Sequence, residues 1–585
     1  MSRNTEVAEI LFEFADLLDA KDVEYKPRAY RRAAENVLEY PVAIEEVAED
    51  GEEAMTKIEG VGDAIAGKIV EYLSTGRIDE LDELREEYPV RMDELTAVEG
   101  VGPKTVGSLY DALGITTLDE LEEAATTGTI QTVKGFGPKT EENILEHIPF
   151  AREAQQRELL GHGRPVADEV LTYLEAIDCV SAAEVAGSIR RWRATIGDID
   201  ILVGTEDGEA VIDHFTGWDR IERIIEAGET KVSVRARGIQ VDIRLVSPND
   251  WGAALQYFTG SKDHNVRLRN RAIDQSRKMN EYGVFEIDDT SAMGDVSDPR
   301  AGNRIAGETE ESMYESLGLE WIPPELREDT GEIAAAAEGR LPSLVTVEDI
   351  RGDLHVHTDW SDGNGTIEEM VAAAEARGYT YVGICDHATG PGMVGGVGLS
   401  DDEIREQIEE VRDVESASEI PVLAGIEANI DGGGEISVDD DVLAELDIVV
   451  ASPHSDLDQD RDAATNRIIA AIEHPSVDII GHPSGRLLNS RPGIELAIDQ
   501  IADVAAREGT ALEINANPRR LDLHGTFVKA AIEAGAPLAI NTDAHSPGEY
   551  GNIRYGVHTA RRGWAEPADI VNTYQTESLE QWLRE

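Results

Sequence analysis

The chain has 585 residues, too many for one hydrophobic core, so we expect roughly three to five domains. With 118 Asp or Glu against 52 Lys or Arg, its formal net charge is −66, which by itself argues against a nucleic-acid-binding protein because such proteins normally need a positive surface. No apolar run approaches the ~18 residues of a membrane span, the start MSRNTEVAEILFEF is unlike a signal peptide, and Cys179 and Cys385 cannot supply a disulfide framework or a cysteine zinc site, so we expect a cytoplasmic protein without a membrane partner.

The first two segments, residues 1–87 and 88–150, are predicted to be helical and contain an internal repeat. One short motif occurs three times, as IEGVGDAIAGKIV, VEGVGPKTVGSLY and VKGFGPKTEENIL. Each copy carries a glycine pair between two expected helices: Gly60 and Gly62, Gly100 and Gly102, Gly135 and Gly137. Such a pair permits a tight turn and lets backbone amides face a phosphate. The copies, two followed by Lys104 and Lys139, indicate helix-hairpin-helix units that hold a DNA backbone; a plain glycine-capped helix turn is the alternative.

The middle of the chain changes to alternating strands and helices. AAEVAGSIRR, GDIDILVG and KVSVRARGIQVDIRLV are rich in β-branched residues and predict, within residues 151–250, a sheet backed by helices. Residues 251–321 return to a mainly helical pattern. Residues 322–347, with a Pro-Pro pair near their start and an alanine run around Ala334, are expected to link this region to the next domain.

Residues 348–585 are predicted to form parallel βα units. The expected strands end in DLHVHT, YVGICDH, PVLAGIEANI, DIVVASPH, DIIGHPSG, ALEINANP and PLAINTDAH. Most are separated by a helical stretch, which predicts a barrel with its chemistry at the carboxyl ends of the strands. The expected fold class is thus multidomain, with α+β and α/β parts.

A first candidate site consists of three carboxylates. Asp198 and Asp200 are two residues apart on a predicted strand and share a face, and Asp242 lies in the strand QVDIRLV. Three carboxylates on adjacent strands suit two Mg²⁺ ions for in-line phosphoryl transfer. In so acidic a chain, an Asp-x-Asp pair alone is equally compatible with a solvated strand edge.

The surrounding motif resembles the nucleotidyltransferase palm of family X DNA polymerases. GSIRRWRATIGDID is followed by VDIRLV and by YFTGSKDHNVRLRNRA. The resemblance implies that Asp198, Asp200 and Asp242 bind Mg²⁺ or Mn²⁺. It implies that Ser188, Arg191 and Gly197 hold the triphosphate of a dNTP and that Tyr257, Phe258 and Gly260 pack its sugar. Asn265 and Arg269 would lie over the nascent base pair from the thumb, residues 251–321.

The N-terminal segment resembles the lyase domain of the same family. By this likeness Lys68 would form a Schiff base with a 5'-deoxyribose phosphate, supported by Tyr30 and Lys26. The family's second lysine is replaced here by Ala64, and a lysine nucleophile needs nearby cations to lower its pKa. Lys68 as a phosphate contact is an equal alternative.

A second candidate site is a set of nine donors at the predicted strand ends of the C-terminal domain. They are His355, His357, Asp362, His387, Glu427, His454, His482, Asp543 and His545. Six imidazoles and three carboxylates suffice for a three-metal cluster with a bridging carboxylate. We interpret His474, His524 and His558 as core or capping residues.

The ordered run of donors resembles the PHP (polymerase and histidinol phosphatase) domain. The resemblance implies that one metal is bound by His355, His357, Glu427 and Asp543. Glu427 would bridge to a second metal held by His454 and His482, and Asp362, His387 and His545 would hold the third. It implies that the bound ions are Mn²⁺ or Zn²⁺ and that the site hydrolyses phosphoesters. The implied activity is a 3'-5' exonuclease that trims 3' ends. Arg486 and Arg519 are candidate phosphate contacts, with ordinary surface charge as the alternative.

The acidity is best explained by adaptation to molar intracellular salt, where the screening length falls to ~3 Å. Ten of eleven lysines precede residue 280, and only Lys529 follows. We therefore expect the N-terminal half to keep a Lys/Arg strip, along the hairpins and the thumb, for DNA.

Together these patterns predict a monomeric repair polymerase that fills gapped or nicked DNA with dNTPs and processes 3' ends. One alternative is a 3'-end nuclease that uses an inactive polymerase fold as a DNA clamp. Another is a gap-binding scaffold without chemistry. A free-standing histidinol-phosphate phosphatase is disfavoured by the fused DNA-binding hairpins.

Overall fold

The computed structural model describes residues 3–584 except 24–25, 40–43, 50, 59, 99, 156, 288–298 and 393–396. The chain divides into two compact units, Met1–Arg157 with Leu487–Pro492, and Glu158–Arg486 with Gly493–Glu585. In the described part of the chain, no helix is both long enough and apolar enough to cross a bilayer.

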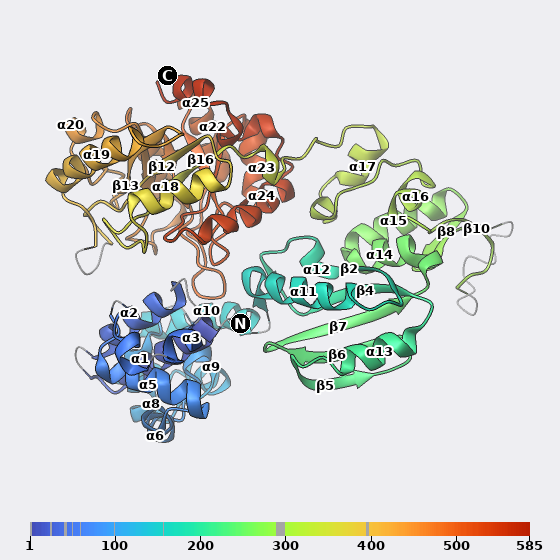
Figure 1. The fold of residues 1–585 in the computed structure, drawn as a ribbon, viewed down its shortest axis with the longest axis horizontal. Helices are drawn as coiled ribbons and strands as arrows, with labels where there is room; N and C mark the ends of the chain where they lie inside the picture. Colours follow the sequence, from blue (N-terminus) through green and yellow to red (C-terminus); the bar gives the residue numbers. More distant parts are fainter. Residues whose placement is uncertain are drawn as a thin grey trace. The chain divides into compact units, whose positions relative to one another are not determined.

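Between residues 3 and 155, the described part of the N-terminal unit consists of helices joined by turns and loops, with no strand (Figure 1). Its helices are α1 (Arg3–Ala20), α2 (Lys26–Glu39), α3 (Ile44–Glu49), α4 (Glu52–Met55), α5 (Asp63–Thr75), α6 (Asp79–Glu87), α7 (Met92–Thr96), α8 (Pro103–Leu113), α9 (Leu118–Thr126), η1 (Ile130–Thr132) and α10 (Pro138–Gln155). They bury one continuous apolar core that includes Leu11, Phe14, Ile69 and Val106. Helices α5, α8 and α10 each begin directly after the second glycine of a repeat, as predicted.

The second unit begins with the expected palm, a sheet with helices. Its elements are β1 (Glu158–Leu159), α11 (Leu160–Glu175), β2 (Val180–Val185), α12 (Gly187–Arg190), β3 (Thr195–Ile196), β4 (Ile199–Thr205), α13 (Gly208–Thr216), β5 (Ile221–Ala227), β6 (Lys231–Ala236), β7 (Ile239–Val246) and η2 (Pro248–Asp250). Five strands form a mixed sheet in the order β2-β4-β7-β6-β5, in which β4 and β7 are parallel. This register places Asp200 directly beside Asp242.

The expected thumb follows. It comprises α14 (Trp251–Thr259), α15 (Lys262–Asp274), β8 (Arg277–Asn280), β9 (Gly283–Glu286), β10 (Asn303–Ala306) and α16 (Glu310–Glu315). Residues 322–347, expected to be a linker, contain η4 (Pro324–Leu326) and α17 (Glu332–Ala337). Ala336 of α17 belongs to the thumb core, and the side chains of Arg327 and Glu332 are fully buried.

The C-terminal domain is the predicted parallel barrel. Its strands are β11 (Gly352–Val356), β12 (Tyr381–Ile384), β13 (Val422–Asn429), β14 (Ile448–Ser452), β15 (Ile479–Ile480), β16 (Ala511–Asn515) and β17 (Leu538–Asn541), which pair in sequence order. A parallel bridge between Val356 and Ala544 connects the ends of the first and last strands, so the barrel is nearly closed. All residues of these strands are buried, as parallel strands covered by helices require.

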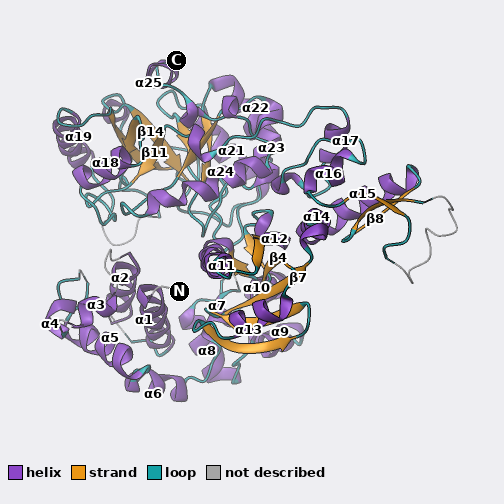
Figure 2. Ribbon diagram, turned by 45° about the vertical axis from the view of Figure 1, so that its right-hand side comes forward, coloured by secondary structure: helices purple, strands orange, loops and turns teal. Residues whose placement is uncertain are grey.

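Helices form the outer layer around these strands (Figure 2). They are α18 (Ile367–Ala376), α19 (Asp401–Glu415), α20 (Asp440–Leu443), α21 (Arg461–Ile472), α22 (Ile498–Glu508), α23 (Gly525–Ala534), α24 (Ile553–Arg562) and α25 (Thr576–Trp582), with the short helices η5 (Val347–Asp349), η6 (Glu549–Asn552), η7 (Pro567–Asp569) and η8 (Val571–Thr573). Helix α18 begins with a capping box between Thr366 and Glu369.

Candidate active sites

The three palm carboxylates form one cluster. Oxygen atoms of Asp198, Asp200 and Asp242 lie within 4.8 Å of one another, a spacing that could hold a metal ion. Burial, followed by the charges of Asp198 and Asp242, raises the pKa of Asp200 to about 6. Burial would also raise the pKa of Asp242, but hydrogen bonds from Lys231, Gln240 and Ser233 hold it below its ordinary value. Lys231 Nζ lies 2.7 Å from Asp242 Oδ2 and partly neutralises the cluster.

The residues expected to hold the triphosphate border these carboxylates. Gly187 opens α12 with a φ of +56°, and an added Cβ would lie 2.2 Å from Asp200 Oδ2. Ser188 follows it in the same short helix, and Gly197 lies exposed directly before Asp198. Arg191 has other partners in this structure, because its guanidinium donates to Thr259 O and pairs with Glu328.

The residues expected around the sugar and base lie together at the junction of α14 and α15. The rings of Tyr257 and Phe258 meet edge to face, with centroids 5.2 Å apart. Asn265 donates from Nδ2 to Tyr257 O at 2.7 Å, and Arg269 donates from Nε to Asn265 O at 3.4 Å. Gly260 ends α14 with a φ of +70°, a backbone conformation that favours glycine.

Phe258 also lines a pocket with residues of the sheet. The pocket includes Asp200, Lys231, Asp242 and Arg244, so it reaches from the carboxylates to the aromatic pair. The Arg244 guanidinium lies 4.3 Å from the centroid of the Phe258 ring. The structure therefore brings Phe258, one of the predicted sugar-packing residues, to the same pocket as two of the predicted metal ligands, Asp200 and Asp242.

The first glycine of each hairpin pair has a left-handed backbone conformation. Gly60, Gly100 and Gly135 have φ values of +72°, +80° and +101°. At the second glycines, Gly62, Gly102 and Gly137, an added Cβ would meet nothing within 4 Å, so the three helix starts are open to a ligand. Lys139 is exposed, whereas Lys104 pairs with Asp22 at 2.8 Å.

Lys68 is not poised as a nucleophile in this structure. Its Nζ lies 2.9 Å from Glu80 Oε2, and only 15% of its side chain is exposed. Burial would lower the pKa of Lys68, but hydrogen bonds with Glu80 and Tyr30 raise it above the ordinary value. Tyr30 is buried against Phe14, and Lys26 and Ala64 are exposed. A charged lysine cannot attack a sugar aldehyde.

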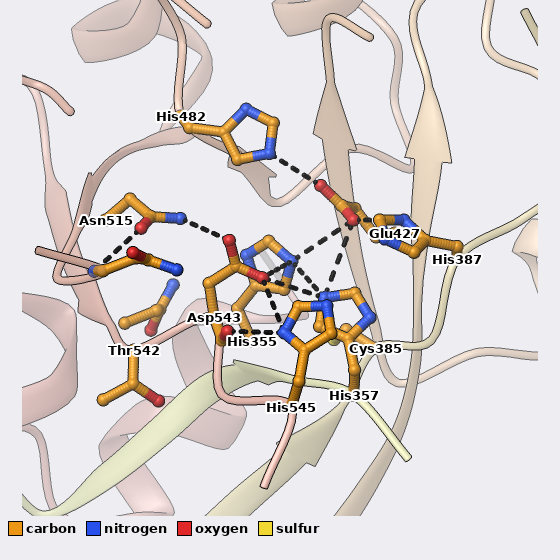
Figure 3. Close-up of polar contacts among 12 residues, drawn as sticks. His355, His357, Cys385, His387, Glu427, His482, Asn515, Thr542, Asp543 and His545 are labelled. Carbon is orange, nitrogen blue, oxygen red and sulfur yellow. Dashed lines mark hydrogen bonds and ion pairs between the residues drawn. The ribbon is translucent and has the colours of Figure 1, made fainter. Parts of the chain in front are cut away.

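The nine donors of the barrel converge at the carboxyl ends of its strands. Figure 3 shows the Glu427 carboxylate facing the imidazoles, with His482 directed at one of its oxygens. His355, His357 and Glu427 are completely buried. Three groups of donor atoms lie close enough to hold a metal ion: His355, His357 and Asp543; His357, Asp362, His387 and His545; and His387, Glu427 and His454. His482 is in none of these groups, but its Nε2 lies 3.1 Å from Glu427 Oε1.

Hydrogen bonds orient several of these imidazoles as ligands. His355 donates from Nδ1 to Glu513 Oε1 at 2.7 Å, and His454 donates from Nδ1 to Asn429 Oδ1 at 2.7 Å. His545 Nδ1 donates to Asp543 O at 2.9 Å. When Nδ1 carries the proton, the Nε2 lone pair can coordinate a metal. In metal sites, hydrogen bonds from the ligand to surrounding residues fix this orientation.

Glu427 carries the strongest sign of a metal. Both of its carboxylate oxygens are buried, and neither accepts a well-aligned hydrogen bond from any described residue. A buried carboxylate without such bonds is costly, so it needs a cation. Burial would raise its pKa, but His387, His454 and His355 hold it well below the ordinary value. The residues present therefore fit a multinuclear metal centre.

Sequence reasoning missed the residues that support this centre. Glu513, fully buried in β16, accepts hydrogen bonds from His355 Nδ1 and His482 N, and Asn429 ends β13. Their signal was a pair of polar residues two positions apart at the end of an otherwise apolar strand, Glu427 and Asn429 in β13 and Glu513 and Asn515 in β16. Arg520 was also missed, and its Nε lies 3.7 Å from Asp543 Oδ2.

The other residues singled out in this domain have different partners. Arg519 is exposed, and Arg486 donates hydrogen bonds to the carbonyl oxygens of Arg520 and Leu521, so it holds the loop that carries Arg520. His474 pairs with Asp440, His524 precedes α23 as its N-cap residue, and His558 pairs with Glu325.

Four family models match parts of this chain. A helix-hairpin-helix domain matches residues 2–78, and a SAM-like helix-hairpin-helix tandem matches residues 92–148. The DNA polymerase beta thumb matches residues 254–328, and the PHP domain matches residues 353–517. The expected hairpins, thumb and PHP domain are confirmed.

Curated relatives match either the whole chain or its C-terminal domain. A probable phosphatase of Caldanaerobacter subterraneus is 30% identical over 248 residues, 40% of this chain and 91% of that protein. A probable phosphatase of Shewanella sediminis is 33% identical over 203 residues, 33% of this chain and 77% of that protein. The DNA polymerase/3'-5' exonuclease PolX of Bacillus subtilis is 33% identical over 567 residues, 96% of each chain. This chain therefore belongs to the PolX family, the family X DNA polymerases that carry a C-terminal PHP domain.

Proposed function

We propose that this protein is a DNA repair polymerase that fills short gaps at its palm and removes 3'-terminal nucleotides at its PHP domain. The observation that carries the proposal is the presence of two separate donor clusters in one chain. Three carboxylates lie together in the palm, and eight donors, with His482 beside Glu427, lie together in the barrel. The full-length likeness to a named DNA polymerase/3'-5' exonuclease supports the same pair of activities.

In the palm, Asp198, Asp200 and Asp242 would hold two Mg²⁺ or Mn²⁺ ions, which lower the pKa of the primer 3'-hydroxyl and stabilise charge on the transferred phosphate. Ser188, Arg191 and the backbone at Gly197 would bind the triphosphate. Tyr257 and Phe258 would pack the sugar, and Gly260 would let the backbone approach it closely. Asn265 and Arg269 would contact the nascent base pair.

In the PHP domain, the nine donors would hold up to three Mn²⁺ or Zn²⁺ ions, which supply a hydroxide near neutral pH and bind a phosphate oxygen. Glu427 would bridge two of the sites, because imidazoles of three different strand ends approach its carboxylate. Glu513 and Asn429 would fix the rings of His355 and His454.

The hairpins would bind gapped or nicked DNA through backbone amides at the starts of α5, α8 and α10, helped by Lys104 and Lys139. Lys68 serves as a phosphate contact in this proposal, because its raised pKa keeps it charged. Weak dependence of DNA binding on salt is expected for a chain of net charge −66 that works in molar salt. A protein of this kind would act as a monomer.

A labelled primer on one-nucleotide-gapped DNA tests the proposal. Wild type, Asp198→Ala/Asp200→Ala and His355→Ala/His357→Ala would be compared in high KCl with Mn²⁺, with and without dNTPs. We expect the palm variant to lose only extension and the PHP variant to lose only shortening. If wild type shortens the primer but never extends it, the palm is a DNA clamp and the protein is a 3'-end nuclease.

A further inference from the structure

The palm loop after α12 is held by a helix of the PHP domain. Three consecutive loop residues contact either α24 or Glu328, which pairs with Arg562 of α24: Arg191, Trp192 and Arg193. Arg562 Nη1 donates to the Arg191 carbonyl oxygen at 2.5 Å, a contact between residues 371 positions apart. The loop that should bind the triphosphate is therefore tied to the other catalytic domain of the chain.

Trp192 supplies the apolar part of this contact. It has a φ of +52°, and its ring stacks on the imidazole of His558 with centroids 3.6 Å apart and planes at 4°. Tyr555 meets the same indole at a steep angle, with centroids 6.0 Å apart. Tyr555, His558 and Arg562 are spaced three and four residues apart, so they share one face of α24. These three side chains therefore form the surface of α24 that contacts the loop.

Glu328 supplies the charged part of the contact between the palm loop and α24. Its Oε1 lies 3.1 Å from Arg191 Nε and 3.2 Å from Arg562 Nη1, and its Oε2 lies 3.6 Å from Arg193 Nη1. Only 13% of the Arg191 side chain is exposed, and its Nη1 donates to Thr259 O at 2.5 Å. The guanidinium is thus already occupied by a carboxylate and a carbonyl.

We propose that Glu328 competes with the dNTP triphosphate for Arg191, and that Arg562 of the PHP domain sets the strength of this competition. This inference rests on the proposed role of Arg191 in nucleotide binding. The exchange is feasible because Glu328 keeps Arg193 and Arg562 as partners when Arg191 turns to the triphosphate, so no buried carboxylate is left without a cation. Arg562 acts as a positioning residue for the polymerase reaction, although it lies in the exonuclease domain.

Two substitutions should change nucleotide affinity in opposite directions. Glu328→Gln removes the competing charge, so KM for dNTP in gap filling should fall about threefold or more. Arg562→Gln removes one of the cations that share Glu328 and frees the Arg191 carbonyl. Glu328 then holds Arg191 more strongly, and KM should rise about tenfold, equivalent to about 1.4 kcal/mol. In both variants kcat and the exonuclease rate should change less than KM.

Arg561→Gln is the control for loss of a charge from α24, because Arg561 pairs with Glu325 and the Val345 carbonyl and not with Glu328 or the loop. Glu325 also pairs with His558, so Arg561→Gln should change KM, but much less than Arg562→Gln does. Arg191→Ala distinguishes failure of the proposed role of Arg191 in nucleotide binding from failure of the proposed competition by Glu328. If it leaves KM unchanged, the role of Arg191 in nucleotide binding fails. If Arg191→Ala raises KM but Glu328→Gln and Arg562→Gln shift KM in the same direction, α24 has only a structural role and the inference is overturned. Glu328→Gln is isosteric, and an unchanged or raised KM in that variant alone would contradict the inference even if Arg562→Gln does not fold.

Discussion

Gly187 lies where a side chain would collide with the polymerase carboxylates. Its φ of +56° is unfavourable for other residues, and an added Cβ would come within 2.2 Å of Asp200 Oδ2. Gly187→Ala should therefore displace Asp200 and add backbone strain of about 1–3 kcal/mol. Because small displacements of catalytic groups are costly, we expect gap filling to fall by about 100-fold or more.

The exonuclease of the same preparation is the internal control for Gly187→Ala, because Gly187 contacts none of the nine PHP donors. Primer shortening without dNTPs should proceed at the wild-type rate. Full extension by the variant would mean that Asp200 can move without loss of function.

Arg520 and Arg519 are neighbours with different surroundings, and they make a matched pair. Arg520 Nε lies 3.7 Å from Asp543, whereas Arg519 is exposed. We predict that Arg520, beside the candidate metal ligand Asp543, binds a phosphate of the DNA substrate. Arg520→Ala should then raise KM of the exonuclease for DNA about tenfold or more, because a charged hydrogen bond to phosphate contributes about 1.5–3 kcal/mol. Arg519→Ala should leave it unchanged. Equal effects of the two substitutions would indicate a general effect of charge.

At the scale of elements, α16 anchors the thumb through a buried carboxylate. Glu310 is 6% exposed and pairs with Arg190 of α12 at 2.8 Å and with the fully buried Arg327 at 2.7 Å. Burial would raise its pKa, but the two guanidinium groups lower it to about 2. Since removal of one partner leaves buried cations unpaired, Glu310→Gln should lower the free energy of unfolding by about 3–5 kcal/mol.

The pH dependence of this effect has a definite sign. The folded pKa of Glu310 is depressed from 4.5 to about 2, so its contribution to stability is complete above pH 4.5 and is lost as pH falls toward 2. Urea unfolding should therefore separate wild type from Glu310→Gln at pH 7 and progressively less below pH 4.5. Glu311→Gln, an exposed neighbour in the same first turn, should change stability by less than about 0.5 kcal/mol. Equal losses in the two variants would contradict the role of the buried pair.

At the scale of the whole molecule, charge governs stability. A net charge of −66 causes self-repulsion that salt screens. If the protein is adapted to molar salt, its thermal midpoint should rise by on the order of 10 °C between about 0.1 M and 2 M KCl, equivalent to about 3 kcal/mol for a domain of ordinary size. Scanning calorimetry in KCl and in sucrose tests this, because sucrose favours burial without screening charge. Equal gains in both would argue against relief of repulsion.

Much of this protein was determined by local sequence. The spacing of Asp198 and Asp200 indicated one carboxylate cluster, although Asp198 lies in a bend directly before β4 and not in the predicted strand. The glycine pairs correctly marked the starts of α5, α8 and α10. The nine PHP donors were recognisable because they lie within or after the carboxyl-terminal parts of short, largely apolar strands, and the carboxyl ends of parallel strands meet at one edge. These features depend on periodicity and on neighbours in the chain.

Contacts between distant segments were decided only by tertiary structure. Glu513 orients His355 across 158 positions, Arg520 rather than Arg519 reaches Asp543, and Arg562 reaches the palm loop across 371 positions. Glu80 and Tyr30 likewise come from distant positions to contact Lys68 and raise its pKa. Strand and helix periods specify which face of an element is buried, but not which element covers it. The partner of a polar side chain is therefore fixed only when the elements pack.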